Sequence, residues 1–112
     1  MSTTVNNIVF EWDDEKNRIN KRKHHVSFET AVNVFFDENC IVKPDYTHSD
    51  YEDRWKIIGK VDDILFVIFT NREERTRIIS ARRADKKERS EYYGNGNLRL
   101  TQGTTLNGRT KS

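Results

Sequence analysis

The fold depends on one stretch of sequence, Arg77-Ile78-Ile79-Ser80-Ala81-Arg82-Arg83-Ala84. Apolar residues occupy both alternating positions of this stretch, which is typical of a strand buried on both faces at the centre of a sheet. Two adjacent arginines end it, and a guanidinium group can hold a phosphate through two parallel hydrogen bonds. The stretch therefore predicts a central strand, with either a phosphate-binding end or a pair of solvated arginines.

Length and composition limit the class of protein. The chain has 112 residues, 34% of them hydrophobic, which suits one small domain with a compact core. No apolar run approaches the ~18 residues of a membrane span, and residues 1–7 do not resemble a signal peptide. The single cysteine, Cys40, excludes an internal disulfide and favours a reducing cytoplasm.

The net charge of +2 is unevenly distributed along the chain. Residues 94–112 carry three basic residues and no acid, which leaves 17 basic against 18 acidic residues in 1–93. Any affinity for nucleic acid must therefore come from local clusters, of which there are two, at residues 16–25 and 72–89.

The first half of the chain predicts a loose lead-in, one short strand and two helices. Residues 1–7 are polar, and residues 8–12 read as the strand. Acidic residues 13–15 and the basic run at 21–25 suit the two ends of a surface helix. A second helix follows an N-cap at Ser27, with apolar residues at i, i+3, i+4 and i+7 from Phe28 to Phe35.

The second half predicts an antiparallel meander of four strands and a terminal helix. The strands are expected at residues 40–43, 54–59, 64–70 and 76–82, with turns at Asp62-Asp63 and at 71–75. Asp85 and Glu88 resemble a capping box, and the helix they begin is expected to end at Gly94. We predict one α+β domain over residues 1–93, a disordered tail over 94–112 and a sheet face left open for the site.

Many positions between residues 8 and 93 resemble the BrnT-type toxin family, in the family's order and spacing. The resemblance rests on Phe10-Glu11-Trp12-Asp13, Lys16, Asn20, Lys23-His24-x-Val26-x-Phe28, Val34-Phe35-x-Asp37, Asp45, His48, Glu52, Arg54, Gly59, Thr70-x-Arg72, Arg77-Ile78-Ile79-Ser80-Ala81-Arg82-x-Ala84 and Glu88-Arg89-x-x-Tyr92. One position departs: His25 stands where the family has a glycine, which suits a left-handed helix end. His25 must adopt that backbone or reshape the turn.

The resemblance implies a RelE-like fold and the toxin of a bacterial type II toxin–antitoxin system. It further implies metal-independent cleavage of RNA by an enzyme without cofactors, which a tightly bound antitoxin protein inhibits. Contact with DNA is expected only indirectly, through the antitoxin. The alternative, from a different class, is a nonenzymatic nucleic-acid-binding or adaptor domain, or a toxin homologue that has lost activity.

Cleavage by the RNA 2′-hydroxyl group needs proton transfer and stabilisation of the phosphorane charge. For these roles the prediction names Lys23, His24, Glu52, Arg54 and Arg82 as catalytic, and Arg72, Ser80, Arg77, Arg83 and Lys86 as RNA-binding. Ser80 and Arg82 share a face by the strand period, opposite to Arg77 and Arg83, while Arg72 could close over Arg82.

Each candidate also has a plain structural interpretation. The basic run at residues 23–25 fits a solvated helix end, and the resemblance favours a catalytic role only for Lys23 and His24. Glu52 and Arg54 fit an ordinary same-face ion pair. A rival metal site at Asp45, His48, Asp50, Glu52 and Asp53 matches no known ligand spacing, so no metal is predicted.

Overall fold

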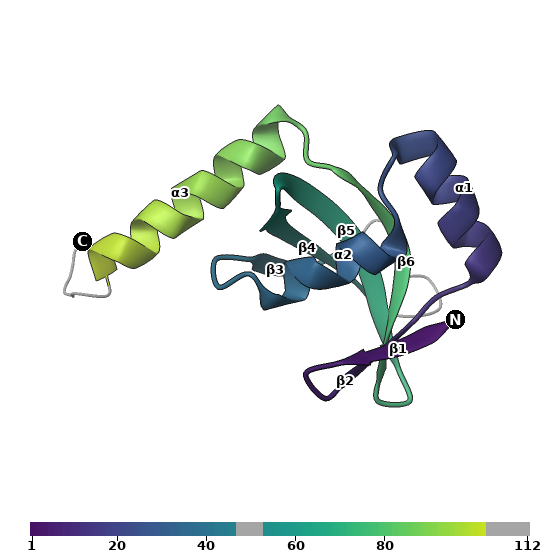
Figure 1. Ribbon diagram of the computed structural model, residues 1–112. Coiled ribbons are helices and arrows are strands. Elements are labelled where there is room, and N and C mark those ends of the chain that lie inside the picture. Colours follow the sequence, from purple (N-terminus) through teal and green to yellow (C-terminus); the bar gives the residue numbers. More distant parts are fainter. Residues whose placement is uncertain (47–52, 103–112) are drawn as a thin grey trace.

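The computed structural model describes residues 1–46 and 53–102, and it describes side chains in this range up to Gly94. Its elements in chain order are β1 (Ser2–Val5), β2 (Ile8–Glu11), α1 (Asp14–His24), α2 (Phe28–Ala31), the 3₁₀ helix η1 (Val32–Phe36), β3 (Ile41–Pro44), β4 (Arg54–Val61), β5 (Asp63–Arg72), β6 (Arg75–Arg83) and α3 (Lys86–Gln102). They form a mixed α+β fold around one sheet (Figure 1).

The sheet has six strands in the order β1-β2-β6-β5-β4-β3. Neighbours pair antiparallel except β2 and β6, which pair in parallel through Phe10–Thr76 and Glu11–Arg77. The described sheet is therefore larger than the predicted four-stranded meander, because the N-terminal hairpin joins its edge. As predicted, β6 lies inside the sheet, between β2 and β5.

The expectation that residues 1–7 form a loose lead-in was wrong, since β1 pairs with β2 along its whole length. Asn6 and Asn7 form the turn, with φ values of 49° and 69°. Positive φ at both central residues matches the right-handed twist of a two-residue hairpin, and asparagine tolerates it well. The β5–β6 turn works the same way with Glu73 and Glu74 (φ 52° and 63°), so it is shorter than the predicted 71–75.

Helix α1 begins and ends with local signals that the sequence carries. The Asp13 side chain accepts a hydrogen bond from the Lys16 N–H at 3.0 Å. At the other end His25 adopts the left-handed conformation (φ 61°), and its N–H donates to the Lys21 carbonyl. Histidine thus tolerates the backbone that a glycine would favour.

The second predicted helix forms, but as two short pieces. Ser27 caps α2 as predicted by accepting a hydrogen bond from the Thr30 N–H. After Ala31 the backbone tightens into η1, which contains two β-branched valines with low helix propensity. This 3₁₀ segment brings Val34 against Gly59 of β4.

The two sheet faces differ in what covers them. One, the α2 face, packs against α2 and η1 and forms the main core with Phe10, Phe28, Val34, Ile57, Val67, Phe69, Ile78 and Ala81. The other, the α3 face, carries the alternate residues of the same strands. Helix α3 covers only one end of it, through a small cluster of Ile41, Ile58, Ile64, Ala84 and Tyr92.

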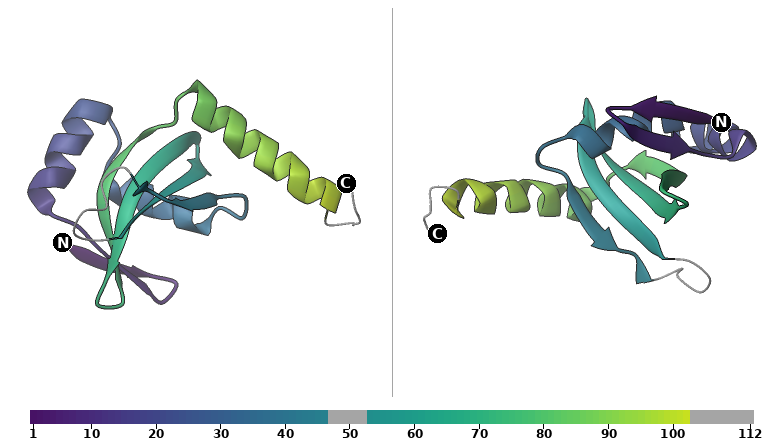
Figure 2. Two further views of the ribbon diagram at one scale, coloured as in Figure 1. Left: turned by 180° about the vertical axis from the view of Figure 1, so that it is seen from behind. Right: turned by 90° about the horizontal axis from the view of Figure 1, so that it is seen from below.

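Helix α3 was expected to end at Gly94 but continues to Gln102, and its C-terminal half extends beyond the sheet (Figures 1 and 2). A glycine permits a left-handed helix end without imposing one, and Gly94 keeps the helical backbone. Tyr92 fixes the first half by donating a hydrogen bond to Asp37 Oδ2 at 2.6 Å. Residues 103–112 of the predicted tail lie outside the described residues.

Among the described helices, none is long and apolar enough to cross a membrane.

Candidate active site

A β-bulge in β6 decides which arginines share a face. Ile68 of β5 lies opposite Ser80, whereas the next residue, Phe69, lies opposite Ile78, so Ile79 is an extra residue in β6. The regular alternation of β6 is therefore interrupted once. As a result Arg77, which the strict period placed opposite Ser80 and Arg82, lies with them on the α3 face.

The register of the sheet gives the order of residues on the α3 face. Three rows cross β4, β5 and β6, namely Arg54–Thr70–Arg77, Lys56–Ile68–Ser80 and Ile58–Phe66–Arg82. Strands are spaced by about 4.8 Å, so Arg54 and Arg77 start about 10 Å apart across one strand. Four of the predicted site residues, Arg54, Arg77, Ser80 and Arg82, lie in these rows, while Arg83 pairs with Leu65 and lies on the α2 face.

Helix α1 lies beside β6 (Figure 1), and residues of these two elements line a groove. The groove has a volume of about 250 Å³ and is lined by Lys16, Ile19, Asn20, Lys23, His24, Ile79 and Ser80. The structure therefore brings Lys23 and His24 together with Ser80, a candidate that lies far from them in the sequence.

The surroundings of His24 favour its neutral form. Burial is the largest cause that lowers the pKa of His24, and the positive charges of Lys23, Arg82 and His25 lower this pKa further. A histidine with a pKa below its usual value is unprotonated near neutral pH, so it can accept a proton. Of these charges, that of Arg82 comes from β6, whereas Lys23 and His25 are the sequence neighbours of His24.

Arg82 lies at the edge of the region that α3 covers. Its guanidinium group donates to both carboxylate oxygens of Glu88, at 2.8 and 2.9 Å, and to the Arg83 carbonyl at 3.1 Å. Its carbon centre lies 4.2 Å from the centroid of the Phe66 ring, a cation–π contact. Glu88 is itself held by the predicted capping box with Asp85, which is confirmed by reciprocal bonds of 2.8 and 2.9 Å.

Arg77, in the row that lies farthest from that of Arg82, has an acidic partner. It donates to Glu11 of β2 at 3.0 Å, and the more exposed Arg75 contacts the same carboxylate at 3.4 Å. Burial acts to raise the pKa of Glu11, but the hydrogen bonds and charges of Arg77 and Arg75 outweigh it and lower that pKa. Glu11 therefore stays ionised and holds Arg77 in place.

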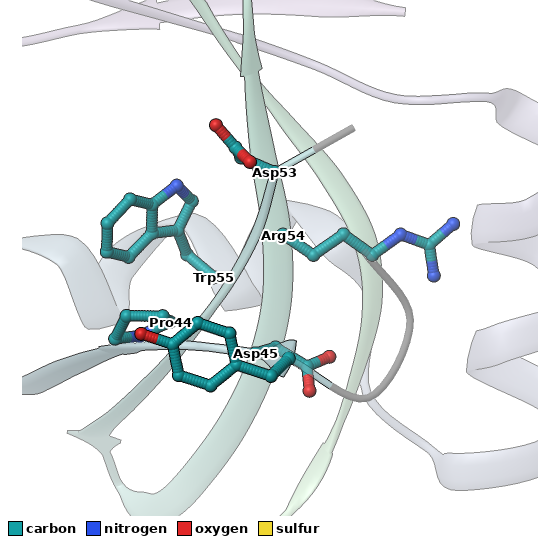
Figure 3. Close-up of a pocket in the computed structure, with 6 residues that line it drawn as sticks. Pro44, Asp45, Asp53, Arg54 and Trp55 are labelled. Atoms are coloured by element: carbon teal, nitrogen blue, oxygen red, sulfur yellow. The ribbon is translucent and has the colours of Figure 1, made fainter. Parts of the chain in front are cut away.

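Arg54 lines a second hollow, separate from the His24 groove. This second hollow has a volume of about 290 Å³ and is lined by Pro44, Asp45, Tyr46, Asp53, Arg54 and Trp55. Arg54 and Trp55 leave β4 in opposite directions (Figure 3), consistent with their places on different faces. Its predicted partner Glu52 lies outside the described residues, as do His48 and Asp50 of the rival metal cluster.

Three further candidates, Arg72, Lys86 and Arg83, lie away from the groove that His24 lines. Arg72 pairs with Arg75 at the β5–β6 turn, whereas Arg82 lies opposite Phe66, six residues back along β5. Six residues of strand span about 20 Å, so Arg72 does not close over Arg82 as predicted. Lys86 is the first residue of α3 and is exposed. On the α2 face, Arg83 contacts Asp63 at 3.1 Å.

Sequence reasoning missed two side chains that organise this region, Asn20 and Glu88. Glu88 was assigned only to the helix cap, although both of its carboxylate oxygens also accept hydrogen bonds from Arg82. Asn20 belonged to the family pattern without a role, and its burial in an otherwise polar helix is the signal that only the tertiary structure gives. Within the described residues no three His, Cys, Asp or Glu side chains cluster as metal ligands do.

This small α+β domain has a histidine, a lysine and several arginines around one open sheet face. These residue types suit proton transfer and phosphate binding, the chemistry of a ribonuclease toxin. The model of one such family, the ribonuclease toxin BrnT of type II toxin–antitoxin systems, matches residues 12–88. The chain belongs to this BrnT family, and the predicted resemblance is confirmed.

A solved relative agrees with the family assignment. The crystal structure of the Brucella abortus ribonuclease toxin BrnT, at 1.1 Å resolution, superposes with a TM-score of 0.53 and 27% sequence identity. The match covers 69% of this chain and 96% of the Brucella chain. No curated protein matches the chain.

Proposed function

We propose that the chain is an endoribonuclease that cleaves RNA without a metal ion, by attack of the 2′-hydroxyl group on the adjacent phosphate. The observation that carries the proposal is the groove in which Lys23 and His24 of α1 meet Ser80 of β6, within electrostatic reach of Arg82. A base of suitable pKa and a nearby cation are what this reaction requires of a protein.

His24 is the proposed proton acceptor, because its lowered pKa keeps it unprotonated near pH 7. Lys23 stabilises the negative charge that grows on the phosphorane, and Ser80 donates a hydrogen bond to the RNA backbone. Glu52 is the proposed second acid–base group, as the family resemblance implies. Arg54, Arg77, Arg72 and Lys86 are the proposed additional contacts to RNA, whereas Arg83, which lies on the α2 face beside Asp63, is not one of them.

Arg82 is proposed to bind the scissile phosphate while Glu88 holds it in place. An arginine has five N–H donors, and Glu88 and the Arg83 carbonyl use three of those on Arg82. The other two, on Nε and Nη2, have no partner among the described residues and point along one edge of the guanidinium plane. That edge can bind a phosphate bidentately without breaking the pair with Glu88.

The remaining features of the proposal come from the family. The chain acts in the cytoplasm as part of a RelE-like group of toxins, and a cognate antitoxin protein binds it and inhibits it. DNA contact, where it occurs, passes through the antitoxin. An adaptor that binds RNA without cutting it is the second candidate function, which Glu88 favours by already occupying one edge of Arg82.

The test is cleavage of RNA by purified protein in EDTA, comparing the wild type with His24→Ala and Arg82→Ala. We expect His24→Ala to lower the rate about 10²- to 10⁴-fold, the usual effect of an acid–base group. Arg82→Ala should lower it about 10²- to 10³-fold, the usual effect of a group that stabilises charge in the transition state. The matched controls are His25→Ala, one residue further, and Arg83→Ala, on the opposite face. His25→Ala should cleave much faster than His24→Ala, and Arg83→Ala much faster than Arg82→Ala.

The outcomes separate the two candidate functions. Cleavage that requires added Mg²⁺, or that survives both substitutions, contradicts the proposed mechanism. A folded wild type that binds RNA and leaves it intact supports the adaptor.

A further inference from the structure

Beyond the end of β2, the side chain of Asn20 supplies hydrogen bonds to the backbone of β6. Strand β2 pairs with β6 only at Thr76 and Arg77. Four residues further along, the Ala81 N–H donates to Asn20 Oδ1 at 3.2 Å, and Asn20 Nδ2 donates to the Ala81 carbonyl at 2.7 Å. The side-chain amide of Asn20 thus takes the place of a strand residue at this edge.

The same amide also holds the turn between α1 and α2. Asn20 Nδ2 donates a second hydrogen bond, at 2.9 Å, to the carbonyl of Val26. Asn20 is 8% exposed, so all three bonds are shielded from water and none is easily replaced by solvent. One side chain therefore joins α1, the turn that follows it and the central strand of the sheet.

The position of Asn20 in α1 connects these bonds to the proposed site. Residues three and four apart on a helix lie on the same side, and Lys23 and His24 follow Asn20 by three and four residues. Asn20, Lys23 and His24 all line the groove over Ser80. On β6, Ala81 lies between Ser80 and Arg82, so the amide holds the helix directly beside the residues that His24 must face.

We propose that Asn20 is a positioning residue of the RNA-cleaving site, which fixes the last turn of α1 against β6 so that Lys23 and His24 face Ser80 and Arg82. This inference rests on the proposed function for its effect on cleavage. Its geometric part, the placement of His24 beside the strand, can be measured without RNA.

The helix offers a matched control three residues earlier. Asn17 also makes two hydrogen bonds out of α1: its Oδ1 accepts from the Phe28 N–H at 2.8 Å, and its Nδ2 donates to Glu29 Oε1 at 2.9 Å. These bonds reach α2 and not β6. Asn17→Ala therefore removes an asparagine that joins two elements while it leaves the groove intact.

The experiment compares Asn20→Ala and the isosteric Asn20→Asp with Asn17→Ala at 10 °C. Asn20→Asp keeps the shape and the acceptor for the Ala81 N–H but loses both donors. The first readout is the pKa of His24 from an NMR pH titration, with the imidazole signals assigned through His25→Gln and His48→Gln. The second is the single-turnover rate and the apparent KM for RNA cleavage.

We expect Asn20→Ala to raise the pKa of His24 towards its usual value, because the ring moves away from Ser80 and Arg82 into water. Asn20→Asp adds a carboxylate that raises this pKa by its own charge, so this variant is compared by its cleavage rate alone. His24 faces the charges of Lys23 and His25 from its own segment and the charge of Arg82 from β6. Only the effect of Arg82 depends on the packing of α1 against β6. The single-turnover rate should fall at least tenfold with less than a threefold change in KM. Asn17→Ala should change neither the pKa nor the rate.

The experiment tests RNA cleavage and the placement of His24 by Asn20 separately. A wild type that does not cleave RNA refutes the proposed function, while the pKa comparison still decides whether Asn20 places His24. An unchanged His24 pKa in folded Asn20→Ala overturns the inference. If neither variant folds at 10 °C, Asn20 serves folding alone and the inference also fails.

Discussion

Gly59 lies where η1 crosses β4, and a side chain there has no room. A β-carbon at this position would lie 2.9 Å from both the Cβ and the carbonyl oxygen of Val34. Because the oxygen belongs to the backbone, η1 itself would have to move. We expect Gly59→Ala to lower the free energy of unfolding by about 1–3 kcal/mol, the usual cost of overpacking.

Urea unfolding checks this prediction, with Gly94→Ala as its control. Nothing lies within 4 Å of a β-carbon added to Gly94, which is helical, so that change should stabilise the protein by about 1 kcal/mol. A Gly59→Ala variant as stable as the wild type would show that η1 does not press on β4 in solution.

Tyr92 makes the stability of the protein depend on pH in the alkaline range. Burial first, and then the hydrogen bond to Asp37, raise the pKa of Tyr92 above its usual value. Below pH ~10 the phenol is neutral in both the folded and unfolded states, so its contribution to stability is complete. Above that pH the unfolded chain ionises first, so the contribution is lost as the pH rises.

We therefore expect Tyr92→Phe to lower stability at pH 8 by about 1.5–3 kcal/mol, the value of a hydrogen bond to a charged group. The difference from the wild type should shrink between pH 10 and 12. Denaturant titrations across this pH range measure it, and Tyr93→Phe, at a side chain that is 53% exposed, should leave the pH dependence as it is. A constant difference up to pH 12 would contradict the assignment.

At the scale of elements, α1 ends on a residue whose backbone is strained. His25 has φ 61°, and the left-handed conformation costs a residue with a β-carbon about 1–2 kcal/mol. His25→Gly should remove this cost and raise the unfolding free energy by about 1 kcal/mol, with cleavage unchanged because His25 is not in the groove.

His25→Ala separates the backbone effect from the loss of the imidazole. Alanine keeps the β-carbon, so its stability should stay near that of the wild type when both are followed by thermal and urea unfolding. Equal stabilisation by alanine and glycine would mean that the histidine ring, rather than the backbone, destabilises the turn.

The bulge in β6 is the element that shaped the site. Without Ile79 as an extra residue, Arg77 would lie on the α2 face, next to a core that has no place for it. With the bulge it lies beside Glu11 on the α3 face. A single irregularity thus places Arg77 on the same side of the sheet as Ser80 and Arg82.

At the scale of the whole molecule, charge is organised by face rather than by net value. The chain carries only +2, yet Arg54, Lys56, Arg77 and Arg82 all lie on the α3 face. RNA binding should therefore depend on salt in a way that reports individual residues of this face. Arg54→Gln should reduce the slope of log K against log salt by about 0.7, the value for one phosphate contact on a single strand.

Arg83→Gln is the matched control, since Arg83 is an arginine of the same sheet on the opposite face. Its slope should equal that of the wild type when binding to a short RNA is titrated from 50 to 300 mM salt with the inactive His24→Ala protein. Equal losses of slope for both variants would show that RNA binds without regard to the sheet faces.

The sequence by itself determined the class and the family of this protein. Local signals specified where helices begin, as at Asp13, Ser27 and Asp85, because caps act within a few residues. Apolar runs bounded by turn residues specified the strands β4, β5 and β6. Lys23, His24 and Ser80 were also candidates from the sequence, and the structure brings them into one groove.

Only the tertiary structure decided what depends on contacts between distant segments. Strand β1 is polar and forms because an edge of the sheet is available, and the bulge at Ile79 appears only in the pairing of β5 with β6. The bonds of Asn20 to Ala81 join residues 61 positions apart, which no local pattern encodes. A helix cap depends on residues a few positions away in the chain. The face on which an arginine lies depends instead on the register between strands.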